Sequence, residues 1–246
     1  MKKIFLPEEI LKKGTFVKIE GDLHHHLANV LRIKVGESFI VSDNENNEFV
    51  SVVEKISSRD TIILLKDFYY REDFQYPETT LFFSVLKGDK NEEIIQKCTE
   101  LGIDNFVPVI TKNTIIKIDN ENGDKKLKKW QLIAKESSMQ SGRFKIPKVL
   151  PIINFNDIES YTPNSFKIVG LLEKKSKSFI NLLNEIKKFD RVSFFIGPEG
   201  DFTKDEIDTL KNNNWQGIRF TNNVLRSETA CFYVASSIFF YYGRGI

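Results

Sequence analysis

The feature that most constrains the fold is an alternation of short apolar runs and helical patterns that begins near residue 81. The apolar runs predict strands over 81–86, 106–110, 167–172, 192–196 and 217–220. Between them, helical spacing predicts helices from about Lys90 to Gly102 with Asp89 as cap, from Asp124 to about Gln140, after the capping box Thr203-x-x-Glu206, and from near Ser227. Strands that alternate with helices predict an α/β domain with a largely parallel sheet.

The N-terminal third has a different pattern. Short β-branched runs at 39–41, 49–53 and 61–65 are separated by turn-rich pieces, and one helical stretch lies between Asp22 and Arg32. This spacing predicts a small barrel or sandwich. The polar, aromatic segment 69–78 shows no period and is interpreted as a linker. We therefore expect one domain over residues 1–72 and a second over 73–246.

Charge is informative locally rather than globally. The net charge of +2 does not by itself indicate a nucleic-acid binder, and residues 1–72 are nearly balanced. Residues 124–150 carry a basic excess that only Asp124 and Glu136 oppose: Lys125, Lys126, Lys128, Lys129, Lys135, Arg143, Lys145 and Lys148. If the chain binds phosphate, this segment is the better candidate, although Lys125–Lys129 is most simply a solvated helix face.

No metal site is expected. Cys98 and Cys231 lie far apart within apolar helical patterns, which is typical of reduced core cysteines in a cytoplasmic protein. The run His24-His25-His26 points its side chains in different directions on a helix and cannot chelate one ion well. No segment predicts a targeting peptide or a membrane span.

Two strand-to-helix turns near the C-terminus are candidate ligand sites. Residues 197–202 follow one predicted strand and residues 221–230 follow another, and ligands of α/β sheets bind at such strand ends. Glycine there allows close approach to a ligand, but it also occurs in such turns for steric reasons alone. The absence of GxxxxGK[ST], and of GxGxxG after a strand, disfavours nucleotide-hydrolysing and nicotinamide enzymes.

Several ordered motifs together resemble one family. Ile-Gly-Pro-Glu-Gly at 196–200, followed about thirty residues on by Leu-Arg-Ser-Glu-Thr-Ala at 225–230, resembles the 16S ribosomal RNA uridine-N3 methyltransferases of the knotted SPOUT superfamily. The resemblance extends over nearly the whole chain, through His26-x-x-x-Val30-Leu31-Arg32, Lys87-Gly88-Asp89-Lys90 leading into 96–102, and Gln140-Ser141-Gly142-Arg143 with Pro147.

The resemblance implies a PUA-like β-barrel domain followed by a SPOUT α/β domain with a C-terminal trefoil knot. It also implies S-adenosylmethionine as methyl donor, 16S ribosomal RNA or the small ribosomal subunit as partner, a homodimer and a cytoplasmic location. The residues that would line the cofactor are Leu171, Leu172, Glu173, Ile196, Gly197, Pro198, Glu199, Gly200, Phe220, Thr221, Asn222, Val224, Leu225 and Arg226.

For the reaction, we expect Arg226 to stabilise the anion of the target uracil and Glu228 to be a candidate base. Arg226 has a second interpretation, as a helix-entry arginine paired with Glu199 or Glu228. RNA contacts are expected from His26, Arg32, Lys87, Lys90, Lys97, Gln140, Arg143 and Lys145.

The chain departs from the family pattern at Asp201, where a glycine is usual, at 221–223, and at Met139, whose position is usually acidic. Two other functions stay open: a related methyltransferase acting on transfer RNA or on a ribose 2′-hydroxyl, and a non-catalytic RNA-binding assembly factor.

Overall fold

The computed structural model describes residues 2–7, 11–44, 47–69, 77–116, 120–172, 179–186 and 189–242. The chain packs into two compact units, 1–73 with 138–146, and 74–137 with 147–246. The sequence predicts a first domain over residues 1–72 alone, whereas in the structure residues 138–146 also belong to the first unit. Most of the interpreted linker, residues 70–76, lies outside the described residues.

The first unit is built on a sheet of order β1-β3-β4-β5-β2. β1 pairs parallel with β3, and the other pairings are antiparallel. The strands are β1 (Lys3–Phe5), β2 (Phe16–Glu20), β3 (Ser38–Ser42), β4 (Glu48–Ile56) and β5 (Asp60–Phe68), with helix α1 (Gly21–His25) and the π-helical turn η2 (His26–Val30) between β2 and β3. The predicted strands 39–41, 49–53 and 61–65 are confirmed, and β1 and β2 were missed.

Residues 138–146 are attached to this sheet through Lys3. Its ammonium group forms a buried ion pair with Glu48 and donates a hydrogen bond of 2.7 Å to the carbonyl of Arg143. The backbone N–H of Ile146 donates to Asn44 Oδ1 at 2.6 Å. Met139 packs against the core of the unit, so the apolar residue at this usually acidic position has a structural role.

The second unit is the expected α/β domain. Its sheet has the order β12-β10-β11-β6-β7-β8, with β9 also beside β7, and all these pairings are parallel. The strands are β6 (Glu78–Ser84), β7 (Asn105–Ile110), β8 (Lys148–Val149), β9 (Ile153–Asn154), β10 (Phe166–Gly170), β11 (Arg191–Ile196) and β12 (Gln216–Ile218). The helices are α2 (Lys90–Glu100), α3 (Asn120–Ser141), η3 (Phe155–Tyr161), α4 (Phe179–Ile186), α5 (Lys204–Asn212) and α6 (Ser227–Tyr241).

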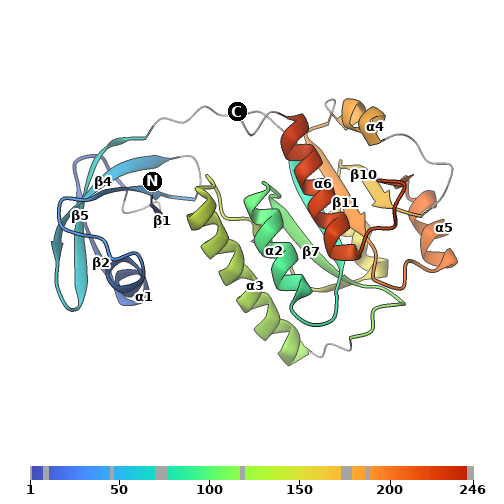
Figure 1. Cartoon of the computed structure of the whole chain (residues 1–246), viewed down its shortest axis with the longest axis horizontal. Helices are drawn as coiled ribbons and strands as arrows, with labels where there is room; N and C mark the ends of the chain where they lie inside the picture. Colours follow the sequence, from blue (N-terminus) through green and yellow to red (C-terminus); the bar gives the residue numbers. More distant parts are fainter. Residues whose placement is uncertain are drawn as a thin grey trace. The chain divides into compact units, whose positions relative to one another are not determined.

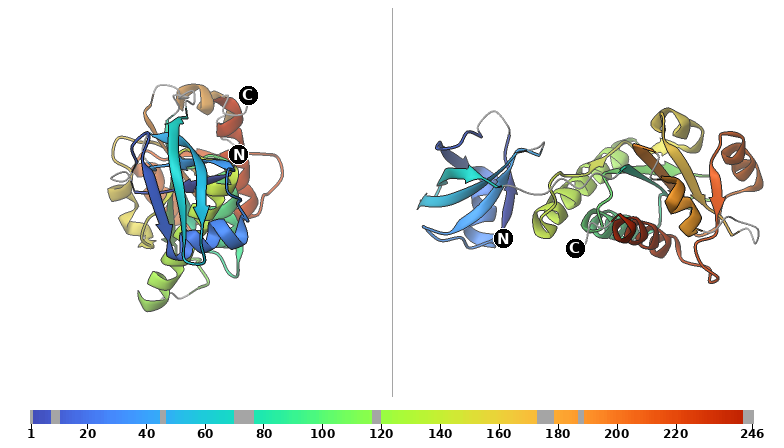
Figure 2. Two further views of the ribbon diagram at one scale, coloured as in Figure 1. Left: turned by 90° about the vertical axis from the view of Figure 1, so that its left-hand side faces the viewer. Right: turned by 90° about the horizontal axis from the view of Figure 1, so that it is seen from above.

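Both faces of this sheet are covered, because alternate strand residues point to opposite sides. Phe83 and Phe194 face a core shared with α2, α3, α4 and α6, whereas Phe82 and Phe195 face η3 and α5. Figure 2 shows α2 and α6 on one side of the sheet and η3 and α5 on the other. From the edge strand β12 the chain returns to the middle of the sheet, where α6 lies beside α2 (Figure 1). The trefoil knot implied by the resemblance stays a prediction.

The helix starts show which local predictions were sound. Thr203 and Glu206 form the predicted capping box at α5, with both reciprocal hydrogen bonds present. Asp89 is the residue at the N-cap of α2, but its side chain makes no capping hydrogen bond. Its φ of −86° and ψ of 2° differ from the extended conformation in which a cap side chain reaches the helix N–H groups.

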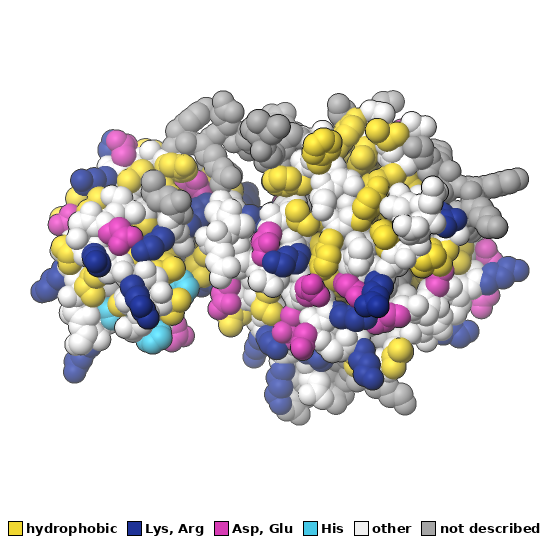
Figure 3. Space-filling model, in the orientation of Figure 1, with side chains coloured by type: hydrophobic (Ala, Val, Ile, Leu, Met, Phe, Trp, Pro, Cys, Tyr) yellow, Lys and Arg dark blue, Asp and Glu magenta, His cyan; other side chains and the backbone are white. Residues whose placement is uncertain are grey.

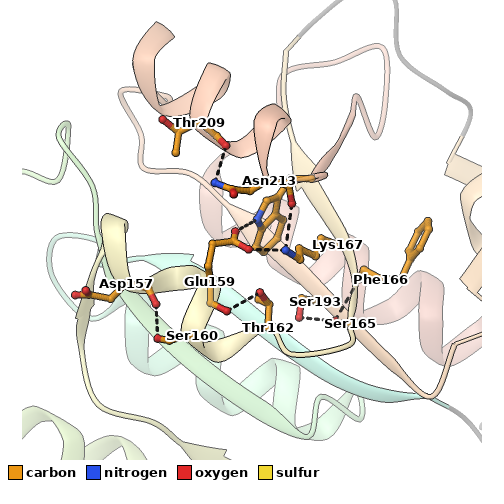
Figure 4. A network of polar contacts seen from close by, with 11 residues as sticks. Asp157, Glu159, Ser160, Thr162, Ser165, Phe166, Lys167, Ser193, Thr209 and Asn213 are labelled. Carbon is orange, nitrogen blue, oxygen red and sulfur yellow. Dashed lines mark hydrogen bonds and ion pairs between the residues drawn. The ribbon is translucent and has the colours of Figure 1, made fainter.

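A polar network braces the turn from α5 into β12 (Figure 4). Glu159 of η3 accepts a hydrogen bond of 2.8 Å from Trp215 Nε1 and pairs with Lys167 of β10 at 2.5 Å. Lys167 Nζ also donates to the carbonyl of Asn213 at 3.1 Å. This network holds β12 against β10 and so fixes the start of the loop that follows β12.

Candidate functional site

A cavity of about 380 Å³ lies where β10, β11 and β12 end. Its walls come from three strand-end segments, 170–172, 196–201 and 219–227, with Lys90 of α2 and Ala230 of α6. In a parallel sheet the carboxyl ends of neighbouring strands share one edge, which is why segments far apart in the sequence meet here.

Gly170 and Gly197 are required by packing within these walls. A Cβ at Gly170 would lie 2.7 Å from Phe220 Cε2, and a Cβ at Gly197 would lie 2.9 Å from Phe202 Cε2. Both distances are shorter than carbon atoms tolerate. The steric reason for glycine therefore holds at Gly197, and it lets Phe202 fill the space beneath the loop.

The geometry of the turn shows why aspartate is tolerated at position 201, where a glycine is usual. Its φ of +59° lies in the left-handed region, which favours glycine but which aspartate tolerates better than most residues. Its Oδ1 accepts a hydrogen bond of 2.8 Å from the N–H of Phe202, and its own N–H donates to the carbonyl of Pro198 at 3.0 Å. The turn keeps the geometry that a glycine would adopt.

A charged cluster lies at the cavity. Lys90 Nζ lies 2.9 Å from Glu199 Oε1 and 3.7 Å from Glu228 Oε2. The hydrogen bond to Glu199 raises the pKa of Lys90. Burial raises the pKa of Glu199, but the hydrogen bond from Lys90, a backbone N–H and the charge of Lys90 together outweigh burial and lower this pKa. A lysine in the first turn of a helix opposes the helix dipole, and these two carboxylates offset that cost.

Arg226 and Glu228 begin α6. Arg226 is the exposed N-cap residue and lines the cavity, whereas Glu228 is buried. Glu228 Oε2 accepts no hydrogen bond from the described residues. Over the same residues, Glu199 and Glu228 pair with Lys90 rather than with Arg226. The interpretation of Arg226 as a structural ion-pair partner thus loses its support.

Comparison with known proteins decides the family. Residues 74–239 match the family model described as an RNA methyltransferase domain, and residues 19–66 match that of an RNA methyltransferase PUA domain. The first match covers more than half of the chain.

The chain belongs to the RNA methyltransferase family.

Individual relatives cover nearly the full length of this methyltransferase. Ribosomal RNA small subunit methyltransferase E of Bacillus subtilis is 30% identical over 241 residues, which is 96% of this chain and 94% of the relative. A crystal structure of a ribosomal RNA small subunit methyltransferase E from Neisseria gonorrhoeae bound to S-adenosyl methionine has a TM-score of 0.86 and 25% identity. It covers 97% of this chain and 96% of that one. The first unit is thus a PUA-like domain and the second an α/β methyltransferase domain.

Most of the predicted cofactor residues of this methyltransferase meet at the cavity. Those in its lining are Leu171, Leu172, Ile196, Gly197, Pro198, Glu199, Phe220, Thr221, Val224, Leu225 and Arg226. Of the predicted residues that the structure describes, Gly200 and Asn222 are not in the lining, and Glu173 lies outside the described residues.

The predicted cofactor set did not include six lining residues, Gly170, Asp201, Arg219, Asn223, Ser227 and Ala230, and Lys90 was assigned to RNA. The place of Lys90 in the lining could have been predicted from the sequence, because Lys90 starts the helix after β6, and the carboxyl end of β6 lies at the same sheet edge. The place of Arg219 could not have been predicted in this way, because its guanidinium bonds to the backbone of its own loop. It donates to the carbonyls of Thr221 and Asn222 at 3.0 and 2.6 Å and shapes the loop from within.

The predicted RNA-contacting residues divide between the two units. His26, Arg32, Gln140, Arg143 and Lys145 belong to the first unit, and Lys87, Lys90 and Lys97 to the second. Arg32, Lys87, Gln140 and Lys145 are exposed, while His26 and Arg143 are half-buried. Lys97 is exposed and pairs with Glu100 at 3.2 Å. Their contact with RNA stays a prediction.

The histidines and cysteines have structural explanations. His24 is buried and its Nδ1 lies 2.9 Å from Thr61 Oγ1. Cys98 and Cys231 are free, buried thiols, and burial raises the pKa of both. The described residues hold no group of three or more His, Cys, Asp or Glu side chains arranged to bind a metal ion. None of the helices in the described ranges is long and apolar enough to cross a membrane.

Proposed function

We propose that the protein transfers a methyl group from S-adenosylmethionine to N3 of a uridine in 16S ribosomal RNA, in the cytoplasm. The observation that carries the proposal is the cavity formed by 170–172, 196–201 and 219–227 in a chain of the RNA methyltransferase family. The relatives named above are small-subunit ribosomal RNA methyltransferases, and one of them is described as bound to this cofactor.

The cavity residues fit that cofactor. Its volume of about 380 Å³ lies in the range of small-molecule sites. Leu171, Leu172, Ile196, Val224 and Leu225 supply apolar surface for an adenine ring. The backbone of 196–199 offers carbonyl and N–H groups, and Glu199 adds a carboxylate for hydroxyl or amino groups of the ligand.

When bound, the cofactor supplies a methyl group activated by its sulfonium. The protein must then make uracil N3 nucleophilic, and N3 attacks well only after it loses its imide proton. The negative charge that results spreads onto the flanking carbonyl oxygens. Arg226 lines the cavity and is exposed, so its guanidinium can face a base that enters the site and stabilise this charge.

Glu228 is our candidate for the proton acceptor. Its Oε2 is buried and, among the described residues, receives no hydrogen bond. Lys90 Nζ lies 3.7 Å from this oxygen, too far to occupy it with a hydrogen bond. Its place in the first turn of α6 also suits a negative charge. Because Glu228 is not part of the cavity lining, the imide proton would reach it through an intervening water.

The RNA itself would be held by the PUA-like unit. Residues 138–146 are fixed to that unit through Lys3, and they carry Gln140, Arg143 and Lys145. A basic loop on a rigid support is suited to phosphate contacts, and we place His26 and Arg32 on the same unit in the same role.

We also propose that the protein is a homodimer. Hydrophobic side chains gather over α4 and α6 on the face shown in Figure 3. Phe240 of α6 is 86% exposed and Ile180 of α4 is 62% exposed. Helix α6 is apolar on its buried side and also carries this exposed apolar patch. Such a patch is typical of a surface that contacts another protein chain.

The test of the function is incorporation of tritiated methyl groups from S-adenosylmethionine into hypomethylated 16S ribosomal RNA or 30S particles. We expect incorporation by the wild type and a fall in kcat of roughly 100-fold or more for Arg226→Ala. Arg226→Lys should recover little, because an ammonium lacks the planar pair of donors that a guanidinium presents to an anionic oxygen. Incorporation into transfer RNA alone would favour the related methyltransferase, and tight RNA binding without incorporation would favour the assembly factor.

A further inference from the structure

The loop that follows β7 is bonded to the loop that builds one wall of the cavity. Asn113 Nδ2 donates to the carbonyl of Gly200 at 3.1 Å and to the carbonyl of Asp201 at 2.9 Å. One amide group therefore satisfies two successive carbonyls. Asn113 Cβ also lies 3.4 Å from the position that a Cβ of Gly200 would take, so little space separates the two loops.

A second link runs beside it. The backbone N–H of Lys112 donates to Glu206 Oε1 at 2.9 Å, and the other carboxylate oxygen of Glu206 accepts from the N–H of Thr203 at 2.8 Å. Glu206 is buried and thus joins the β7 loop to the start of α5. The cavity-wall loop is thus bonded to Asn113 directly at Asp201, and to Lys112 through Glu206 at Thr203.

The β7 loop is itself well supported. The N–H of Thr111 donates to Thr114 Oγ1 at 2.9 Å, and Thr111 Oγ1 donates to Ser84 Oγ at 3.4 Å. Ser84 is the last residue of β6, and both it and Thr111 are buried. Asn113 is therefore presented from a closed turn anchored to two central strands.

The wall loop needs such support because its conformation is locally unfavourable. Asp201 has a φ of +59°, and a non-glycine residue in the left-handed region costs free energy. The N–H groups of Asp201 and Phe202 are satisfied within the loop, whereas the carbonyls of Gly200 and Asp201 accept hydrogen bonds from Asn113 of another loop. Loss of that donor frees the turn to relax, and Pro198, Glu199 and Asp201 of the cavity lining move with it.

We propose that Asn113 is a positioning residue for the cofactor: its side-chain amide holds the turn at Gly200–Asp201 in the conformation that binds S-adenosylmethionine. The proposal rests on the proposed function of the cavity. Asn113 acts through the loop, because among the described residues it is not part of the cavity lining.

The decisive variant is Asn113→Asp, which has the same shape but replaces the donor by a second acceptor facing two carbonyls. Asn113→Ala removes the donor without that repulsion. Asn105→Ala is the matched control, since Asn105 is the first residue of β7, at the end of the strand opposite to the loop that carries Asn113. Its Nδ2 donates a hydrogen bond of 2.9 Å to Glu78 Oε1, and it does not line the cavity. Binding of S-adenosylmethionine is measured by calorimetry on the full chain, and KM and kcat by methyl transfer.

We expect Kd and KM for S-adenosylmethionine to rise about tenfold or more for Asn113→Asp, and several-fold for Asn113→Ala. The kcat at saturating cofactor should stay within about twofold, a split that a merely structural role would not give. Asn105→Ala should match the wild type. A Kd for Asn113→Asp within about twofold of the wild-type value overturns the proposal.

Amide hydrogen exchange separates this proposal from the function on which it rests. Without any ligand, exchange at Asp201 and Phe202 should speed up in both Asn113 variants and not in Asn105→Ala. Unchanged exchange refutes the role of Asn113 in holding the turn, even for a variant too unstable for calorimetry. If the wild type does not bind S-adenosylmethionine while exchange responds as expected, the cofactor assignment fails and the positioning role for that cofactor fails with it.

Discussion

The contact between Gly170 and Phe220 gives the sharpest prediction about how the cavity is built. In Gly170→Ala the new methyl group would lie 2.7 Å from Phe220 Cε2. An ordinary carbon–carbon contact is about 3.5–4.0 Å, so the ring must retreat by roughly 1 Å. Its other neighbours are Phe179 and Tyr233, with ring centroids at 5.3 and 5.9 Å, and the space left to it is the cavity.

Overpacking of this kind costs about 1–3 kcal/mol. For a chain of this size, each kcal/mol lowers Tm by roughly 2–4 °C, so we expect a fall of about 2–12 °C. The displaced ring should also raise the Kd for S-adenosylmethionine roughly tenfold. Thermal unfolding followed by circular dichroism and calorimetric titration measure the two effects.

Two further variants make the reasoning refutable. Gly200→Ala brings its Cβ only to 3.4 Å from Asn113 Cβ, and it should lower Tm much less. Phe220→Leu should cost less stability in the Gly170→Ala background than in the wild type, because it removes the clashing ring atoms. If Gly170→Ala keeps the wild-type Tm and Kd, or if the two substitutions are simply additive, then close packing against Phe220 is not the reason for glycine at position 170.

The remaining predictions concern the charged cluster and the apolar face of α6. The pKa of Glu199 is lowered from 4.5 and that of Lys90 is raised from 10.5. Their pairing therefore stabilises the fold fully between pH 4.5 and 10.5. This stabilisation is lost as pH falls through the folded pKa of Glu199 or rises through that of Lys90. We expect Glu199→Gln to cost about 0.2–1 kcal/mol in urea unfolding at pH 7. This difference should shrink as pH falls below 4.5 and through the folded pKa of Glu199; a difference that stays constant on acidification would contradict the ion pair. Phe240→Asp should convert the dimer to monomer in sedimentation velocity, whereas Lys145→Asp should not; a monomeric wild type would refute the proposed dimer.

Much of the α/β unit was predictable because its signals are local. The strands before Gly197 and near Gly217 are short apolar runs, and the capping box Thr203–Glu206 marks α5 directly. Helix α4 was overlooked even though Phe179, Leu182, Leu183 and Ile186 have helical spacing and are all buried.

Other features could not be derived from the sequence because they depend on contacts between distant residues. The attachment of 138–146 to the first unit depends on Lys3 and Glu48, which no local pattern joins. The requirement for glycine at position 197 comes from Phe202, five residues on, once the loop has folded back. The left-handed turn at Asp201 becomes visible only when its φ is known, and the bracing by Asn113 only when β7 lies beside the wall loop.

The central claim is that this cavity serves methylation of uridine N3 in 16S ribosomal RNA. The most direct measurement is mass spectrometry of nucleosides from hypomethylated 16S ribosomal RNA incubated with the protein and S-adenosylmethionine, with a parallel digest mapped to the modified nucleotide. We expect N3-methyluridine at a single position, formed by the wild type and nearly absent with Arg226→Ala. A methyl group on a ribose 2′-oxygen, methylation of transfer RNA alone, or no methylation of any RNA would contradict it.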